Sequence, residues 1–203
     1  MTRPLILPAS DPAAIRQAAA TLKAGGTVVF PTDTVYGLGA DAFSEPAIQK
    51  LFEIKDRQPN QAIAVLIGDL AQLDLLTENI PASAMALVRK HWPGALTVIV
   101  PRKAGVPEIL SPTPTLGVRM PDHPAALALL RASGPLAVTS ANLSGGANAS
   151  TAGQVLEQLD GRFDLLLDGG ATPGGVPSTV VDMTGTQPKV LRQGPIVVNI
   201  SDS

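Results

Sequence analysis

The sequence predicts an α/β fold in which helices flank a mixed sheet. Short apolar runs alternate with amphipathic stretches of helical period through most of the chain, and further strand-like runs cluster near its end. The 203 residues are 45% hydrophobic and 16% charged, which is enough apolar material for a substantial core. A chain of this length is expected to form a single domain, here residues 1–203.

Local start and stop signals define the expected elements. Asp11 and Pro12 provide an N-cap and a first-turn proline, and Gly25 ends that helix. Thr151 and Gln154 stand at the spacing of a capping box. Helices are expected over residues 11–24, 44–57, 69–76, 82–91, 123–131 and 151–159. Strands are expected over residues 27–30, 62–67, 96–100, 116–120, 136–139, 163–167, 178–182 and 189–191.

The composition excludes several kinds of chemistry. The sequence has no cysteine, which rules out disulfides, thiolate nucleophiles and cysteine-based metal sites. The two histidines, His91 and His123, are too few for a multi-histidine metal site, so no protein-bound metal is expected. Both histidines are expected to be structural rather than catalytic.

Charge and hydropathy limit the possible partners. A net charge of −2 and an aromatic content of 3% argue against nucleic-acid binding by charge or stacking, although a local basic patch and weak RNA binding stay open. Residues 1–8 lack the features of a signal peptide, and no apolar run reaches membrane-spanning length. A soluble cytoplasmic protein without membrane contact is expected.

Two glycine-containing segments follow predicted strands. Residues 31–39, PTDTVYGLG, combine hydroxyls, a carboxylate and a phenol with glycines that let backbone amides approach a ligand. An ordinary strand-to-helix turn explains the same pattern, so both interpretations remain open. Residues 169–175 have no following lysine and open no helix, and we interpret them as a flexible connection.

Two polar pairs are candidates for ligand binding. Lys55 and Arg57, near a helix end, could clamp a phosphate, but such a pair is by itself more typical of a solvated helix end. Ser140 and Asn142 follow a buried strand, where a ligand loop and a polar turn are equally consistent. The chain has no P-loop, no dinucleotide fingerprint after its first strand and no nucleophile elbow.

Seven segments together resemble the YrdC-like family of threonylcarbamoyl-AMP synthases. In order, they are GGTVVFPTDTVYGLGADAF, KDR, HWPGALTVIVPR, LGVRMPDHP, VTSANLSGG, PSTVVD and VLRQG, and they extend from about Ala24 to Gly194. The resemblance implies a twisted α/β fold around a large concave cavity. It also implies a nucleotidyltransferase that makes threonylcarbamoyl-AMP and pyrophosphate from L-threonine, bicarbonate and ATP, with Mg²⁺ on the triphosphate. The product would pass to a complex that modifies the adenosine next to a tRNA anticodon.

The resemblance implies roles for individual residues. Lys55 and Arg57 would form the catalytic nucleotide clamp, and Arg119 would hold the threonine carboxylate. Further ATP contacts would come from Gln61, Thr115, Ser140, Asn142, Ser150 and Arg192. Further threonine contacts would come from Thr34, Thr139 and Ser178. The chain departs from many relatives at Gln58, where they have proline, and at Leu66, where some have histidine.

The implied reaction requires cations rather than a nucleophilic side chain. The threonine amine would capture carbon dioxide or bicarbonate, and the new carboxylate would attack the α-phosphate and release pyrophosphate. Cations would reduce the repulsion among these anionic groups.

Two alternatives are a carbamoyl-adenylating enzyme of the kind used in hydrogenase maturation and a non-catalytic RNA-binding module. The first carries zinc-finger and acylphosphatase-like parts, for which the chain has no cysteine and no spare length. The chain resembles the short form of the family, so the extra C-terminal domain of the long form is not expected.

Overall fold

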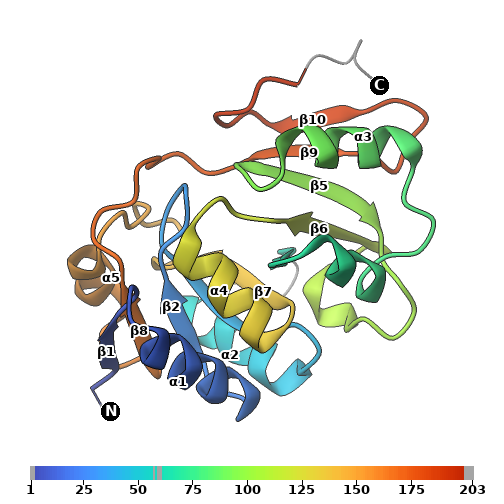
Figure 1. Ribbon diagram of the computed structural model, residues 1–203. Helices are drawn as coiled ribbons and strands as arrows, with labels where there is room; N and C mark the ends of the chain where they lie inside the picture. Colours follow the sequence, from blue (N-terminus) through green and yellow to red (C-terminus); the bar gives the residue numbers. More distant parts are fainter. Residues whose placement is uncertain (1–2, 57, 59–60, 199–203) are drawn as a thin grey trace.

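The computed structural model describes residues 3–56, 58 and 61–198, which form one ten-stranded mixed sheet with helices on its faces (Figure 1). The strands lie in the order β1-β8-β2-β3-β7-β4-β6-β5-β9-β10. Their bounds are β1 Leu5–Pro8, β2 Val28–Phe30, β3 Gly37–Asp41, β4 Ala64–Leu66, β5 Leu96–Pro101, β6 Thr115–Arg119, β7 Leu136–Ser140, β8 Leu165–Asp168, β9 Thr179–Asp182 and β10 Lys189–Arg192. The α-helices are α1 Pro12–Lys23, α2 Glu45–Lys55, α3 Ala82–His91, α4 Pro124–Ser133 and α5 Ala152–Leu159, and the 3-10 helices are η1 Leu70–Leu75 and η2 Glu108–Leu110.

Helix caps in the structure follow from the sequence signals. The Asp11 carboxylate accepts a hydrogen bond from Ala13 N at 2.8 Å at the start of α1. At α5 the Thr151 hydroxyl accepts from Gln154 N at 3.3 Å, but the Gln154 amide oxygen accepts from Ser150 N rather than Thr151 N. The expected capping box therefore forms with its second half displaced by one residue. Among the described residues, every helix is too short or too polar to cross a lipid bilayer.

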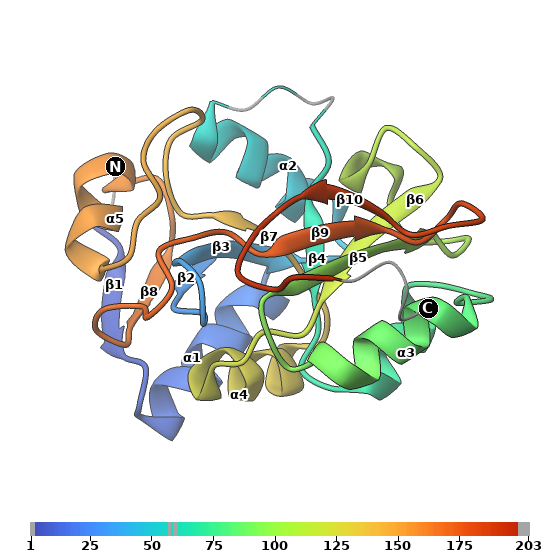
Figure 2. The same cartoon turned by 90° about the horizontal axis from the view of Figure 1, so that it is seen from above.

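The helices cover both faces of the sheet. Figure 2 shows α1 and α4 side by side on one face of β2, β3 and β7, with α2 on the opposite face. Apolar side chains of α1 and α4 form one buried cluster with β2 and β8. The larger buried cluster includes apolar side chains of α2, α3 and α5 together with the central strands. The predicted α/β class and mixed sheet are confirmed, and each predicted helix and strand is present with ends shifted by at most a few residues.

Two strands were not expected from the sequence. β1 pairs in parallel with β8 at one edge of the sheet. β3 lies between β2 and β7, antiparallel to both, so the segment after β2 turns into a strand rather than a helix. Its glycines permit this close packing, because a Cβ at Gly37 would lie 2.8 Å from Val138 Cγ1 and one at Gly39 would lie 2.9 Å from Phe30 Cε1.

Candidate functional site

A cavity of about 590 Å³ opens beside the central strands of the sheet. From β6, Thr115, Gly117 and Arg119 line the cavity, whereas Leu116 and Val118 between them are buried in the core. This alternation follows from the pleat of a strand. Because four residue steps of about 3.3 Å separate Thr115 from Arg119, their Cα atoms lie about 13 Å apart along β6.

The cavity combines apolar walls with hydroxyl groups and two arginines. Its apolar lining includes Ala64, Leu66, Ile99, Val138 and Val180. Its polar lining includes Thr32, Thr34, Thr97, Ser111, Thr113, Thr115, Arg119, Thr139, Ser140, Asn148, Ser178 and Arg192. Among the described residues, no carboxylate lines the cavity and no group of three or more His, Asp or Glu residues could hold a metal ion. This lining suits an anionic ligand with many acceptor oxygens.

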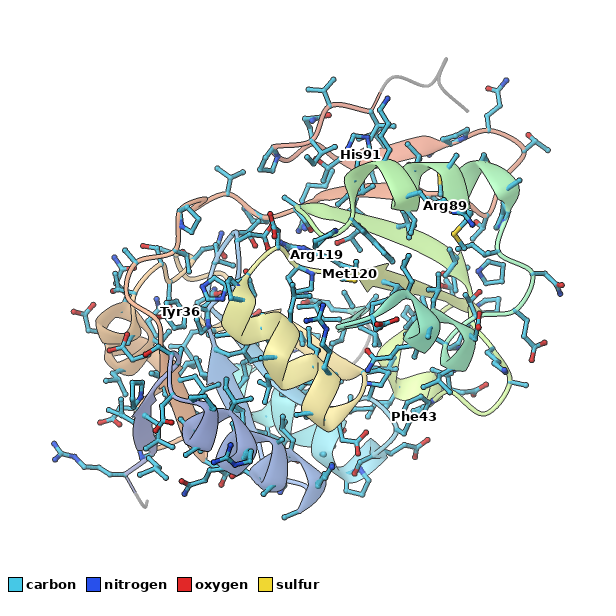
Figure 3. All side chains as sticks on the ribbon, in the orientation of Figure 1. Tyr36, Phe43, Arg89, His91, Arg119 and Met120 are labelled. Carbon is cyan, nitrogen blue, oxygen red and sulfur yellow. The ribbon has the colours of Figure 1, made fainter. Side chains whose placement is uncertain are left out.

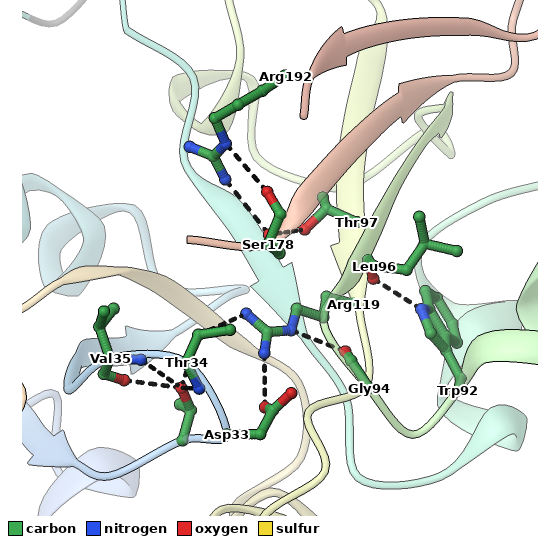
Figure 4. A network of polar contacts seen from close by, with 11 residues as sticks. Asp33, Thr34, Val35, Trp92, Gly94, Leu96, Thr97, Arg119, Ser178 and Arg192 are labelled. Carbon is green, nitrogen blue, oxygen red and sulfur yellow. Dashed lines mark hydrogen bonds and ion pairs between the residues drawn. The ribbon is translucent and has the colours of Figure 1, made fainter. Parts of the chain in front are cut away.

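Arg119 is a buried cation with three internal partners. Its Nε donates to Gly94 O at 3.0 Å, its Nη1 to Thr34 Oγ1 at 3.0 Å and its Nη2 to Asp33 Oδ1 at 2.5 Å (Figure 4). Burial lowers the pKa of the guanidinium, the Asp33 carboxylate raises it, and the positive charge of Arg192 lowers it. Three of five N–H groups are used, so Arg119 keeps donors for a ligand while its plane is fixed.

Thr34 offers a ligand an acceptor rather than a donor. The Thr32 hydroxyl donates to Val35 O at 2.7 Å, so Thr34 is the donor in the 3.0 Å bond between the two threonine hydroxyls. Thr34 Oγ1 also accepts from Arg119 Nη1. One lone pair of Thr34 Oγ1 is left, and it matches an ammonium or hydroxyl group of a ligand.

Arg192 lies across the cavity with Ser178 and Thr97. Its Nε donates to Ser178 O at 3.0 Å and its Nη2 to Ser178 Oγ at 3.3 Å (Figure 4). The hydroxyls of Ser178 and Thr97 are 2.8 Å apart. Burial lowers the pKa of Arg192, and the resulting pair of partly desolvated guanidinium groups favours an anion between them.

The glycine-rich segment 169–175 is tied to the cavity wall. Tyr36, which lines the cavity, donates its hydroxyl hydrogen to Gly170 O at 2.7 Å and accepts from Gly169 N at 3.1 Å. Gly175 N donates to Thr34 O at 2.8 Å, and a Cβ at Gly174 would lie 2.7 Å from Asp33 O. The segment is a connection between β8 and β9, as predicted, and these hydrogen bonds attach both of its ends to residues 34–36 of the cavity wall. Figure 3 shows Tyr36 and Arg119 within the body of the molecule.

Lys55 is buried, which overturns the interpretation of a solvated helix end. Its residue exposure is 2%, and its Nζ donates to the backbone oxygens of Ser140 and Asn142. It is not among the lining residues of the cavity, so in this structure it fixes the loop after β7. Arg57, its expected partner in a phosphate clamp, lies outside the described residues.

The expected nucleotide contacts divide into two groups. Thr115, Ser140 and Arg192 line the cavity, as do the expected threonine contacts Thr34, Arg119, Thr139 and Ser178. Gln61, Asn142 and Ser150 do not. The Asn142 amide nitrogen donates to Leu143 O and Gly146 O, and its buried Oδ1 has no partner among the described residues. Ser150 instead hydrogen bonds to Gln154.

Some lining residues were not singled out from the sequence. Among the polar ones they are Thr97, Ser111, Thr113 and Asn148, whereas Thr32 belongs to the candidate segment 31–39. For Thr97, the signal was available, because it alternates with the buried Leu96 and Val98 on a predicted strand. Ser111, Thr113 and Asn148 lie in connections, where no period indicates the direction of a side chain.

The two histidines lie apart from the cavity lining. His91 is at the end of α3 (Figure 3). His123 is the N-cap residue of α4, and its buried Nδ1 has no partner among the described residues. Burial lowers the pKa of His123, whereas Asp33 and Asp122 raise it. His123 is thus close enough to Asp33 to feel its charge, but it is not a lining residue of the cavity.

Curated proteins of known sequence resemble this chain over most of its length. A threonylcarbamoyl-AMP synthase of Bacillus subtilis is 47% identical over 196 residues, which cover 94% of this chain and 56% of the relative. A threonylcarbamoyl-AMP synthase of Pseudomonas fluorescens is 33% identical over 180 residues, which cover 88% of this chain and 96% of the relative. The chain thus spans about half the length of some relatives and nearly all of others.

The fold is shared with a solved structure. The crystal structure of Pyrococcus abyssi Sua5 complexed with L-threonine matches with a TM-score of 0.91 and 39% identity, covering 95% of this chain and 58% of that chain. The profile of the Sua5/YciO/YrdC family, described as telomere recombination, matches residues 20–194. The cavity with its paired arginines lies within this match, and the chain belongs to the Sua5/YciO/YrdC family.

Proposed function

We propose that this chain is a nucleotidyltransferase that makes threonylcarbamoyl-AMP and pyrophosphate from L-threonine, bicarbonate and MgATP. The observation that carries the proposal is the cavity with two arginines and many hydroxyls, in a chain whose structural relative binds L-threonine. The Mg²⁺ ion would enter on the ATP phosphates as part of the substrate. The product is a mixed anhydride, and we propose that it passes to a tRNA-modifying complex.

The threonine would lie at the Arg119 end of β6. The unused N–H groups of Arg119 would hold the carboxylate, and the acceptor lone pair of Thr34 would receive an ammonium hydrogen. Thr139 and Ser178 line the cavity and would complete this subsite. Leu66 is 5% exposed and lines the same cavity, so it would present an apolar contact where some relatives have histidine.

The nucleotide would extend toward the Thr115 end of β6. Thr115 and Ser140 line that space and supply hydrogen-bond donors for its oxygens. Arg192, which hydrogen bonds to Ser178 beside Thr97, would contact the phosphates from the Arg119 end of the cavity. Lys55 would act through the loop that carries Ser140, because its ammonium group donates to two backbone oxygens of that loop. Arg57 remains a proposed phosphate contact.

The chemical steps balance without a nucleophilic side chain. Bicarbonate loses hydroxide to give carbon dioxide, and the neutral threonine amine attacks the carbon of that molecule. The nitrogen releases one proton, which combines with the hydroxide to form water, and a carbamate is formed. A carbamate oxygen then attacks the α-phosphorus of ATP; the new O–P bond forms, the bond to the bridging oxygen of pyrophosphate breaks, and pyrophosphate leaves. Arg119 and Arg192 would offset the repulsion among the anions, and the concave site would limit loss of the carbamate to water.

Pyrophosphate release from ATP tests the proposal. The wild-type chain is mixed with MgATP, L-threonine and bicarbonate, and each is omitted in turn. Release is expected to require all three, and the adenylate is expected by mass spectrometry. Release that depends on carbamoyl phosphate instead of threonine would favour the carbamoyl-adenylating alternative, and no turnover together with salt-sensitive RNA retention on filters would favour the RNA-binding one.

A further inference from the structure

Three hydroxyl groups form a hydrogen-bonded series along one wall of the cavity. Ser111 Oγ is 3.0 Å from Thr113 Oγ1, and Thr113 Oγ1 is 2.7 Å from Thr115 Oγ1. All three residues line the cavity. Ser111 and Thr113 belong to the connection between η2 and β6, and Thr115 is the first residue of β6.

The donor and acceptor of each hydrogen bond in this series of hydroxyl groups follow from counting the available hydrogens. Each hydroxyl has one hydrogen to donate and two lone pairs. Ser111 Oγ already accepts from Thr113 N at 3.3 Å. If Thr115 donated to Thr113 and Thr113 to Ser111, the hydrogen of Ser111, a residue that is 7% exposed, would find no acceptor among the described residues. Ser111 also lines the cavity, but it is more buried than Thr115, so a hydroxyl hydrogen without a protein acceptor costs more at Ser111 than at Thr115, and this direction is disfavoured.

The opposite direction satisfies every hydroxyl except the last. Ser111 donates to Thr113, Thr113 donates to Thr115, and the hydrogen of Thr115 is left for a group in the cavity. Hydrogen bonds in such a series polarise one another, which strengthens the terminal donor. The ligand atom that meets Thr115 must therefore be an acceptor.

We propose that Ser111 and Thr113 are positioning residues for the nucleotide, because they orient the Thr115 hydroxyl as a donor toward an acceptor oxygen of that substrate. Thr115 lies at the opposite end of β6 from Arg119, so its hydroxyl serves the nucleotide rather than threonine. This inference rests on the proposed function, since it takes the nucleotide as the ligand at this end of the cavity.

Thr113→Val and Thr113→Ser form the matched pair that tests the inference. Thr113 is exposed, and valine keeps its shape while removing the hydroxyl, so both variants are expected to fold. Thr113→Val is expected to raise the KM for ATP about 3- to 10-fold, with the KM for threonine within about 2-fold of wild type, because one neutral hydrogen bond is lost at the nucleotide end. Thr113→Ser keeps the hydroxyl and is expected to restore the KM for ATP.

A double-mutant cycle with Thr115→Val separates a positioning role from an independent one. In the Thr115→Val background, Thr113→Val is expected to add less than about 2-fold to the KM for ATP, because the donor that it orients is already gone. Additive effects, an unchanged KM for ATP in Thr113→Val, or an equal rise in the KM for threonine would each overturn the inference.

The wild-type assay distinguishes a failure of this inference from a failure of the proposed function. If the wild-type chain releases pyrophosphate only with threonine and bicarbonate, the function stands whatever Thr113→Val does. Dissociation constants of the Thr113→Val chain for ATP and adenosine then locate the acceptor. A loss for ATP alone assigns the acceptor to the phosphates, and an equal loss for both assigns it to the nucleoside.

Discussion

The two ends of β6 hold their cavity-facing side chains in different ways. Arg119 is 6% exposed, and an aspartate, a hydroxyl and a backbone oxygen fix its guanidinium. Thr115 is half-buried, and its hydroxyl is oriented by a series of neutral groups. The buried charge of Arg119 thus has rigid partners that include an opposite charge, whereas the neutral donor of Thr115 needs only a defined direction.

Replacing Arg119 by lysine is expected to have the largest effect. The ammonium keeps the charge but cannot reproduce the planar fork between Asp33, Thr34 and a carboxylate. We expect kcat/KM for threonine to fall about 100-fold, or roughly 3 kcal/mol, with less change in the dissociation constant for ATP. Steady-state pyrophosphate release and ATP binding measure the two quantities, and equal losses would contradict a threonine-specific role.

The substitution Asp33→Asn removes the ion pair that holds Arg119 in place, and Asp33 itself is not a lining residue of the cavity. The amide keeps a hydrogen-bond acceptor but removes the charge that opposes burial of the guanidinium. We expect the free energy of unfolding to fall by about 1–3 kcal/mol and the KM for threonine to rise several-fold. Chemical denaturation gives the first quantity. Wild-type stability would show that the Asp33–Arg119 pair contributes no net free energy.

Gly117 lies between the two ends of β6, and because it has no side chain it leaves space for a ligand in that part of the cavity. A Cβ there would lie 3.3 Å from Thr97 Cγ2 and would project into the cavity. Gly117→Ala is expected to lower kcat about 10-fold, because small misplacements of reacting groups are costly, while the melting temperature stays equal or rises. A parallel loss of melting temperature and activity would assign Gly117 a structural role only.

The smallest expected effect is a pH dependence of stability at His123. Its pKa is lowered in the folded chain, so below the ordinary histidine value of about 6.5 the unfolded chain binds more protons than the folded one. The free energy of unfolding therefore falls as pH drops below about 6.5 and is level above it. His123→Gln is expected to reduce this slope in denaturation series between pH 5 and 8, and an unchanged slope would refute the assignment.

The elements with strong local signals could be predicted from the sequence. The cap at Asp11 and the apolar periods of β5, β6 and β7 gave elements whose ends agree within a few residues. β3 could not be predicted, because its sequence, GLGAD, has low strand propensity and is held by β2 and β7 on either side. Pairing with β2 and β7, rather than local sequence preference, therefore gives residues 37–41 their strand conformation.

The site was predictable where side chains lie on strands. Arg119 and Thr115 were assigned from the resemblance, and the strand period places both in the cavity. Burial of Lys55 could not be predicted, because a lysine near a helix end is usually solvated and its acceptors are about 85 residues away in the chain. The hydrogen-bonded hydroxyls that begin at Ser111 depend on the conformation of a connection. A connection has no regular alternation of side chains, so these contacts could not be predicted from the sequence.

The order of the strands has a consequence for synthesis of the chain on the ribosome. β2 lies between β3 and β8, and β3 also pairs with β7. Strands from the first fifth of the chain can therefore pair on both sides only after residues 136–140 and 165–168 have been synthesised. Such long-range pairing slows folding and leaves apolar edges such as Val28–Phe30 open until the late strands emerge. The nascent chain is therefore expected to need shielding of β2 during most of translation, and its cavity is complete only after β10, which carries Arg192, has been made.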